Sequence, residues 1–304
     1  MKLFAFGLGY CACDFIARYG SAFEAIFGTV RDAEKPRVNG DQQVTTFVFD
    51  REKEDPGIAE ALAQSDVILV SVPPGISVDP VLAKFGRRLA ALPQKLTIIY
   101  LSTIGVYGDR QGEWVDEDRL PAPKSDRSVA RLHAEKAWMA LALDGRKTVH
   151  ILRLAGIYGP GRNALSALRQ GKAHRIIKKD QVFNRIHVAD ISAAIAAVLN
   201  YGGEGVGEIW NLSDDEPSPP QDVVTFAASV MGVEPPPEQD IEVANLSALG
   251  RTFYGENKRA SNGKLKEKLG IALAFPTYRE GIVALWEAGE GREVQMDASA
   301  ENLS

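Results

Sequence analysis

Apolar runs alternate with helical patterns along the first half of this sequence, and this alternation constrains the fold more than any other feature. The runs are apolar throughout and rich in β-branched and aromatic residues, which is typical of strands buried on both faces of a parallel sheet. We expect strands over Lys2–Phe6, Ala25–Val30, Val44–Phe49, Val67–Val72, Leu96–Leu101 and Val149–Leu154. We expect helices between them over 14–19, 58–63, 80–92 and 128–143. The pattern predicts an α/β fold with a doubly wound, Rossmann-type parallel sheet.

A glycine turn lies between the first strand and the first helix. Its residues are Gly7, Leu8, Gly9, Tyr10, Cys11 and Ala12. Gly7 permits the tight turn, Gly9 lets the backbone approach a pyrophosphate, and Ala12 lets the helix and the strand pack closely. The helix start offers free N–H groups and the positive end of its dipole to phosphates. A simple glycine-rich turn is the alternative, but the position favours a dinucleotide site in which all six residues contact the cofactor.

The end of the second strand bears on which dinucleotide is bound. An NAD site normally places Asp or Glu there, roughly 20 residues past the glycines, to hold the ribose hydroxyls. Here Arg31 follows the strand, and an arginine fork suits the 2′-phosphate of NADP. Asp32 is next to it and weakens this preference, and a solvated arginine is a further alternative. We expect NADP, with NAD as the alternative. Asp50, at the end of the third strand, is expected to bind the adenine amino group or to cap a helix.

Several further segments carry a family resemblance. They are Leu101–Gly108 (LSTIGVYG), Arg153–Gly161 (RLAGIYGPG), Arg185–Asp190 (RIHVAD) and Phe275–Gly281 (FPTYREG). In this order, and with the glycine turn, they resemble the extended short-chain dehydrogenase/reductase superfamily, which contains the NAD-dependent epimerases and dehydratases. The resemblance runs over most of the chain. It implies an oxidoreductase or epimerase-like enzyme that acts on a carbohydrate-like or nucleotide-linked alcohol or ketone.

The resemblance also implies individual site residues. Thr103 matches the Ser or Thr that precedes V-Y-G in that family, and it would orient the reacting oxygen. The segment that begins at Arg153 resembles the one that closes over the nicotinamide. We therefore expect four more cofactor contacts, at Val72, Ser102, Leu154 and Ile157.

The working pair of the superfamily, Tyr-x-x-x-Lys in the helix after strand five, is absent from this chain. If Glu135 aligns with the glutamate that often follows the lysine by four residues, Arg131 stands at the lysine position and Arg127 at the tyrosine position. Arg131 can bind the nicotinamide ribose, but a guanidinium does not titrate at working pH, so Arg127 cannot be the acid/base. A solvated face with an ion pair to Glu135 is the alternative for both arginines. The missing tyrosine motivates a second hypothesis, a non-catalytic NADP(H)-binding sensor or interaction protein.

The pattern becomes irregular after residue 159. Helices are expected over 164–170 and 186–199 and a short strand over 208–212, and proline clusters at 217–220 and 235–237 mark boundaries. We expect a dinucleotide-binding domain over 1–160, completed by 186–214, a smaller α/β substrate domain over 161–185 and 215–290, and a tail over 291–304. Basic residues gather in sequence between the two domains: Arg162, Arg169, Lys172, Arg175 and Arg185. We expect Arg127, Arg162 and Arg185 to bind the substrate, with ordinary surface charge as the alternative.

Composition narrows the possible partners. The formal net charge is −5 and no long basic run occurs, which argues against nucleic acid because phosphate binding needs clustered Lys and Arg.

Cys11 and Cys13 are too close for an ordinary disulfide and C-x-C alone is a poor metal site, so we expect no metal and a reducing, cytoplasmic compartment. No run approaches the roughly 18 apolar residues of a membrane span, so no membrane partner is expected. The resemblance implies a homodimer through the helices at 80–92 and 128–143, with a monomer that buries both helices as the alternative.

Overall fold

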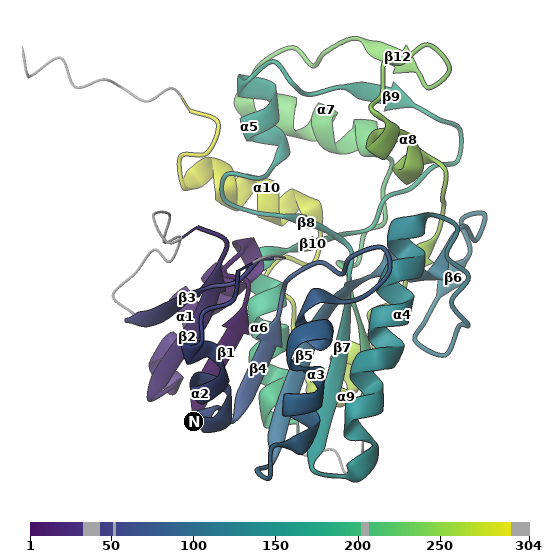
Figure 1. Ribbon diagram of the computed structural model, residues 1–304. Coiled ribbons are helices and arrows are strands. Elements are labelled where there is room, and N and C mark those ends of the chain that lie inside the picture. The colour runs from purple at the N-terminus through teal and green to yellow at the C-terminus, as the bar shows by residue number, and fades with distance from the viewer. Residues whose placement is uncertain (33–42, 51–52, 202–206, 293–304) are drawn as a thin grey trace, which may run out of the picture.

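The computed structural model describes residues 1–32, 43–50, 53–201 and 207–292. Its centre is a seven-stranded sheet in the order β11-β7-β5-β4-β1-β2-β3, in which every neighbouring pair is parallel (Figure 1). The strands are β1 (Lys2–Phe6), β2 (Ala25–Val30), β3 (Val44–Val48), β4 (Val67–Val70), β5 (Leu96–Thr103), β7 (Lys147–Leu154) and β11 (Ile209–Leu212). The predicted doubly wound parallel sheet is confirmed.

Helices cover both faces of this sheet (Figure 1). On one face lie α1 (Tyr10–Tyr19), α6 (Val188–Asn200) and α9 (Gly263–Leu269), and on the other α2 (Gly57–Gln64), α3 (Pro80–Ala91) and α4 (Asp126–Ala140). In β1, Leu3 and Ala5 join the first core, whereas Phe4 and Phe6 join the second. Successive side chains of a strand point to opposite faces, so strands covered on both sides are apolar throughout.

A polar cap fixes where α3 begins. The Asp79 carboxylate accepts hydrogen bonds from the N–H groups of Val81 and Leu82 at 2.9 and 3.1 Å, and Pro80 occupies the first turn of α3. The other Asp79 oxygen accepts from the indole N–H of Trp138 in α4 at 3.2 Å. This one carboxylate therefore starts α3 and ties it to α4, the helix that carries Arg127 and Arg131.

A smaller domain lies beyond the carboxyl edge of the sheet (Figure 1). It contains α5 (Ala164–Arg169), α7 (Pro220–Met231), α8 (Ala248–Tyr254), α10 (Tyr278–Glu287) and the paired strands β9 (Arg175–Ile177) and β12 (Glu238–Asp240). Leu165, Val223, Tyr278 and Ile282 are among its core residues. The strands β8 (Gly156–Tyr158) and β10 (Arg185–His187) pair between this domain and the sheet. Three short 3-10 helices are also present, over Gly20–Ala22, Ile104–Tyr107 and Leu141–Asp144.

Two expectations about the second half need correction. The helix predicted over 186–199 begins at Val188, because the ring of His187 accepts a hydrogen bond from the Ala189 N–H and caps it, and the residues before it form β10. Residues 259–273, which we assigned to the smaller domain, lie instead against the large sheet. There β13 (Arg259–Ala260) pairs with β6 (Trp114–Val115), and Leu265 of α9 is buried in the same core as β11.

Candidate functional site

The glycine turn follows β1 beside β4, where the order of strands along the sheet reverses. Ligands of doubly wound sheets bind at such a point, beyond the carboxyl ends of the strands. Gly7 has a φ of +86°, and a Cβ there would lie 2.9 Å from Cγ2 of Val72, so only glycine is suited to this position. The Gly7 N–H donates to Thr29 Oγ1 at 2.8 Å and the Ser71 hydroxyl donates to the Gly7 carbonyl at 2.5 Å, which ties the turn to both neighbouring strands.

The first turn of α1 can receive an anion. Gly9 is its N-cap, and no side chain in the described part of the chain caps this helix. Its N–H groups and the positive end of its dipole are therefore available to a phosphate. The side chains of Leu8, Cys11 and Ala12 are buried, so these residues offer a ligand their backbone. The turn thus fits the pyrophosphate of a dinucleotide.

A hollow of about 380 Å³ lies at the carboxyl ends of β2 and β3. It is lined by Arg31, Asp32, Val48, Asp50, Lys53, Glu54, Asp55 and Pro56. The structure thus brings together Arg31 and Asp50, the two residues expected at the adenosine end of the cofactor. The sequence motifs did not single out Lys53, whose backbone N–H donates to Asp50 at 2.7 Å. The position of Lys53, a basic residue five positions after the end of β3, is the sequence signal that indicates it.

Arg131 is held at the carboxyl end of β5. One guanidinium nitrogen donates to the Tyr100 hydroxyl at 3.0 Å and to the Leu101 carbonyl at 2.8 Å. Arg127, one helical turn earlier in α4, is exposed. Glu135, one helical turn after Arg131, is buried and forms its ion pair with Arg153. The alternative, a solvated helix face with an ion pair between Glu135 and Arg131, is therefore not observed. Arg131 therefore lies beside the strand whose end carries Thr103.

A buried polar network lies beneath the site and joins α4 to β5 and β7. Arg153 pairs with Glu135 at 2.8 Å, and both side chains are 3% exposed. The Ser102 hydroxyl donates to the same carboxylate at 2.5 Å, and Arg153 also donates to the Tyr107 hydroxyl at 2.9 Å. We expected Ser102 to contact the cofactor, but its hydroxyl is engaged in the core by Glu135. Contact between Ser102 and the cofactor stays a prediction.

Two hydroxyl groups flank the backbone that follows β5. Thr103 Oγ1 accepts a hydrogen bond from the Gly105 N–H at 3.1 Å. A Cβ on Gly105 would lie 3.4 Å from Thr103 Oγ1 and 2.9 Å from Ser128 Oγ, so both hydroxyls border the same small space. Ser128 was not among the predicted site residues, although it directly follows the position aligned with the missing tyrosine. Such hydroxyls can donate to or accept from a substrate oxygen.

The tyrosines of the neighbouring segments are poor replacements for the missing one. Tyr107 is buried and donates to Asn211 Oδ1 at 2.8 Å, and Tyr158 is buried against the smaller domain. Burial raises the pKa of both phenols, so both stay protonated at neutral pH. Burial also lowers the pKa of His187 to about 4, and His133 is exposed on α4. No proton donor is assigned among these side chains.

The basic residues that gather in sequence between the two domains separate in space. Arg175 pairs with Glu238 at 2.6 Å across β9 and β12. Arg185, expected to bind substrate, is partly buried, and its guanidinium donates to Ser218 Oγ at 2.8 Å and to the Phe183 carbonyl at 3.1 Å. The sequence did not indicate these internal partners, and substrate binding by Arg185 stays a prediction. Arg162, by contrast, is exposed.

The remaining cofactor contacts stay predictions. Val72 is half-buried beside Gly7, and Leu154 is buried at the end of β7. Ile157 is half-buried in β8 and packs against the core of the sheet. All three stand on segments that end or pass near the carboxyl edge, which is where the resemblance places them.

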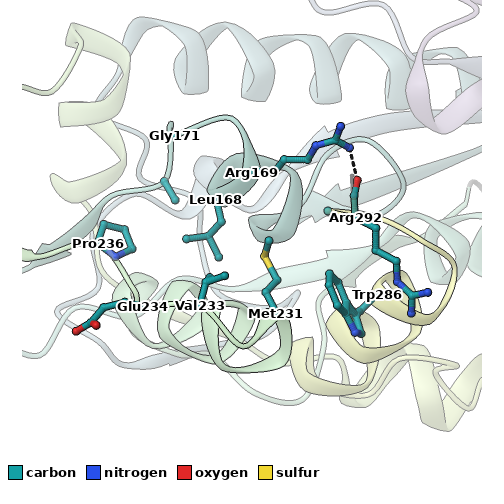
Figure 2. A pocket seen from close by; sticks show the side chains of 11 residues that line it. Leu168, Arg169, Gly171, Met231, Val233, Glu234, Pro236, Trp286 and Arg292 are labelled. Atoms are coloured by element: carbon teal, nitrogen blue, oxygen red, sulfur yellow. Dashed lines mark hydrogen bonds between the residues drawn. The ribbon is translucent and has the colours of Figure 1, made fainter. Parts of the chain in front are cut away.

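A wider hollow of about 700 Å³ lies in the smaller domain, between α5 and the ends of α7 and α10 (Figure 2). Leu168, Met231 and Trp286 line it, and the guanidinium of Arg169 donates to the Arg292 carbonyl beside them. None of the predicted cofactor or substrate residues lines this hollow. Within the described ranges, no group of three or more His, Cys, Asp or Glu side chains is placed to hold a metal ion, and no helix is long and apolar enough to cross a membrane.

The sheet, its strand order and the glycine turn define a dinucleotide-binding protein of Rossmann type. Residues 85–213 match the family model described as the NAD dependent epimerase/dehydratase family. Protein YeeZ of Escherichia coli strain K12 is 30% identical over 228 residues, which are 71% of this chain and 74% of that protein. The chain belongs to the NAD-dependent epimerase/dehydratase family, within the extended short-chain dehydrogenase/reductase superfamily.

Two solved structures place the whole chain in this fold. A functionally unknown conserved protein from Silicibacter pomeroyi DSS is 38% identical, with a TM-score of 0.84 over 95% of this chain and 99% of that one. UDP-glucuronic acid 4-epimerase from Bacillus cereus, solved in complex with NAD, is 18% identical, with a TM-score of 0.74 over 94% of this chain and 96% of that one. The superfamily resemblance read from the sequence is confirmed.

Proposed function

We propose that this chain binds NADP(H) and acts with it on a carbohydrate-like or nucleotide-linked alcohol or ketone, as an oxidoreductase or epimerase-like enzyme. The observation that carries the proposal is the turn at Gly7 and Gly9, which leads into a helix without a capping side chain at the point where the strand order reverses. Family membership supports the same cofactor class, and a solved structure of the same fold holds NAD.

The hollow beyond β2 and β3 supports NADP over NAD. Arg31 and Lys53 both line it and both are exposed, so two cations can face a 2′-phosphate there. Asp32 and Asp50 line the same hollow and suit the ribose hydroxyls of NAD, which is the alternative.

The far end of the site supports the chemistry. A bound nicotinamide would supply or accept a hydride, and the chain's own residues would place it and the substrate. Arg131 would bind the nicotinamide ribose, because it is already held at the Leu101 carbonyl. Thr103 and Ser128 would hold the reacting oxygen of the substrate. Arg127 stands where the family has its tyrosine, so the proton would pass through water or the substrate itself.

A second candidate function is a non-catalytic NADP(H)-binding sensor or interaction protein. The observation that favours it is the tyrosine position itself, which holds an exposed Arg127, while the nearby Tyr107 and Tyr158 are buried with raised pKa values. Turnover of NADPH that depends on an added substrate and survives purification would exclude this second function.

Binding of the two dinucleotides tests the proposal directly. The full chain is titrated with NADPH and with NADH by calorimetry, together with Arg31→Ala, Lys53→Ala and the control Arg87→Ala, an exposed arginine of α3. We expect NADPH to bind more tightly than NADH, and Arg31→Ala to weaken NADPH by about tenfold, the loss of one charge-assisted hydrogen bond, with little change for NADH. Binding of neither dinucleotide would contradict the proposal. Tighter binding of NADH, unchanged in Arg31→Ala, would contradict the NADP preference alone.

A further inference from the structure

Arg162 lies over the first turn of α1, although it belongs to the segment between β8 and α5. Its guanidinium is 6.0 Å from the ring centre of Tyr10, and its side chain makes no hydrogen bond or ion pair with the described residues. Burial raises the pKa of Tyr10 and of Cys11 to about 12, and the charge of Arg162 opposes both shifts. The positive charge of Arg162 is therefore felt at the start of α1, where a phosphate would sit.

The loop that carries Arg162 is fixed from three sides. Its backbone closes on itself, because Gly159 and Arg162 exchange two N–H to carbonyl hydrogen bonds of 3.0 Å. The Tyr10 hydroxyl donates to the Pro160 carbonyl at 3.0 Å, which joins the loop to the glycine turn. On the other side, one carboxylate oxygen of Glu290 accepts from the Gly161 N–H at 2.9 Å.

Glu290 holds the loop through its other oxygen as well. That oxygen accepts from the Asn163 side-chain amide at 3.0 Å and from the Ser166 hydroxyl at 2.7 Å. Glu290 lies just after α10, so a residue of the smaller domain holds this loop in place beside the glycine turn. Because the backbone of this loop is already ordered, a ligand that binds it pays little for ordering the backbone, which favours affinity.

The glycine turn itself has no cation. Residues 7–12 contain neither Lys nor Arg, and the nearest basic residue of α1, Arg18, pairs with Asp14 at 2.7 Å. A pyrophosphate bound to backbone N–H groups alone would keep much of its charge uncompensated. Arg162 is the exposed cation that stands across from this turn without a polar partner of its own in the described chain.

We infer that Arg162 binds the pyrophosphate of the cofactor from the smaller domain, with Glu290 as the residue that positions its loop. This inference rests on the proposed function, and it replaces the substrate-binding role that the sequence suggested for Arg162. It makes the cofactor a bridge between the two domains, because the α1 N-terminus and the loop before α5 would hold the same group.

Calorimetry with ligands that differ in their phosphates tests this role. Wild type, Arg162→Ala, Arg162→Lys and the control Arg87→Ala are titrated with NADPH, NADH, adenosine 2′-phosphate and UDP-glucose. We expect Arg162→Ala to weaken NADPH and NADH by the same factor of about ten, because both carry the pyrophosphate, and Arg162→Lys to recover part of it. Adenosine 2′-phosphate lacks a pyrophosphate, so its affinity should not change.

The other outcomes separate the inference from the proposed function. Unchanged dinucleotide affinity in Arg162→Ala, while wild type binds NADPH, overturns the inference and leaves the proposed function standing. A loss confined to UDP-glucose restores the substrate role of Arg162 and also overturns it. Failure of wild type to bind either dinucleotide removes both.

A double-mutant cycle tests the positioning role of Glu290. We expect Glu290→Gln to weaken both dinucleotides by about threefold in the wild-type background and to have no further effect in Arg162→Ala, because the two residues would act through one contact. Equal effects of Glu290→Gln in both backgrounds would show a general structural role and would overturn the positioning role. The melting temperature of each variant, measured without ligand, identifies any loss that comes from unfolding.

Discussion

The Asp214 carboxyl is a buried acid with only part of its hydrogen-bonding capacity used. It is 2% exposed just after β11, and one oxygen accepts from the Glu216 N–H at 3.3 Å. The other oxygen is buried without a hydrogen-bond partner in the described chain. Burial raises its pKa to about 8, and the nearby guanidinium of Arg185 opposes this shift while Asp215 and Glu216 add to it.

A pH dependence of stability follows from Asp214. The pKa in the folded chain lies above that of the unfolded chain, so the folded state holds this proton more tightly. The contribution to the free energy of unfolding is complete below about pH 4 and is lost as the pH rises toward 8. We expect Asp214→Asn to remove this loss and to be more stable than wild type by about 1–2 kcal/mol at pH 8.

Thermal unfolding at pH 5 and pH 8 measures this difference. The comparison between the variant and wild type cancels the other titrating groups, including His150 and His187, whose pKa values burial lowers to about 4. A variant whose melting temperature changes with pH in parallel with wild type would show that Asp214 is ionised in the folded chain.

Single residues also show why part of the site could be predicted and part could not. The glycine turn at Gly7 and Gly9 could be located from the sequence, because its conformation depends on neighbours within one strand–turn–helix unit. The hydrogen bond between Ser102 and Glu135 could not be predicted, because Glu135 is 33 residues away and its position depends on how α4 packs. The hydrogen bond between Arg185 and Ser218, also 33 residues apart, could not be predicted for the same reason.

At the scale of elements, α3 and α4 depend on one carboxylate. Asp79→Ala removes the cap of α3 and leaves the indole N–H of Trp138, which is fully buried, without an acceptor. We expect a loss of about 2–4 kcal/mol in the free energy of unfolding, the sum of a lost cap and an unsatisfied donor. Ser125→Ala removes the cap of α4 and the hydrogen bond from the Ser125 hydroxyl to Ser128 Oγ, and should cost about 1 kcal/mol.

Urea unfolding, monitored by tryptophan fluorescence, measures the free energy of unfolding of Asp79→Ala and of Ser125→Ala. Equal losses in Asp79→Ala and Ser125→Ala would mean that the contact with Trp138 adds nothing to stability.

The elements that the sequence predicted best are those buried on both faces. All six expected strands of the first half occur, because an unbroken apolar run leaves little choice between strand and loop. The capping box at the start of α10, formed by Thr277 and Glu280, is a helix start signal that can be recognised in the sequence. For α9 no local signal was available, since an amphipathic helix of seven residues does not reveal which core its apolar side covers.

At the scale of the whole molecule, the chain returns to the large sheet after building the smaller domain. Leu265 of α9 is fully buried there, and Lys264 donates to the Ile209 carbonyl of β11 at 2.9 Å. The large domain is therefore complete only with residues that follow most of the smaller one. We expect Leu265→Ala to lower the free energy of unfolding by about 2–5 kcal/mol, as for other buried leucines.

The matched control is Leu143→Ala, because Leu143 is 81% exposed and its loss should change stability by no more than about 0.5 kcal/mol. Both are compared by urea unfolding of the full chain. A small effect of Leu265→Ala, close to that of the control, would mean that α9 is not part of the core that holds the sheet together.

The carboxylate of Glu290 also has a consequence for how the protein is made. It fixes a loop 129 residues earlier in the chain. At ribosomal rates of about 5–20 residues per second, roughly 6–25 seconds pass between the synthesis of that loop and that of the residue that anchors it. During this interval the glycine turn is already present, while the segment that faces it lacks its anchor. The nascent chain would therefore acquire the proposed nucleotide site in two stages, and only the second depends on the residue that follows α10.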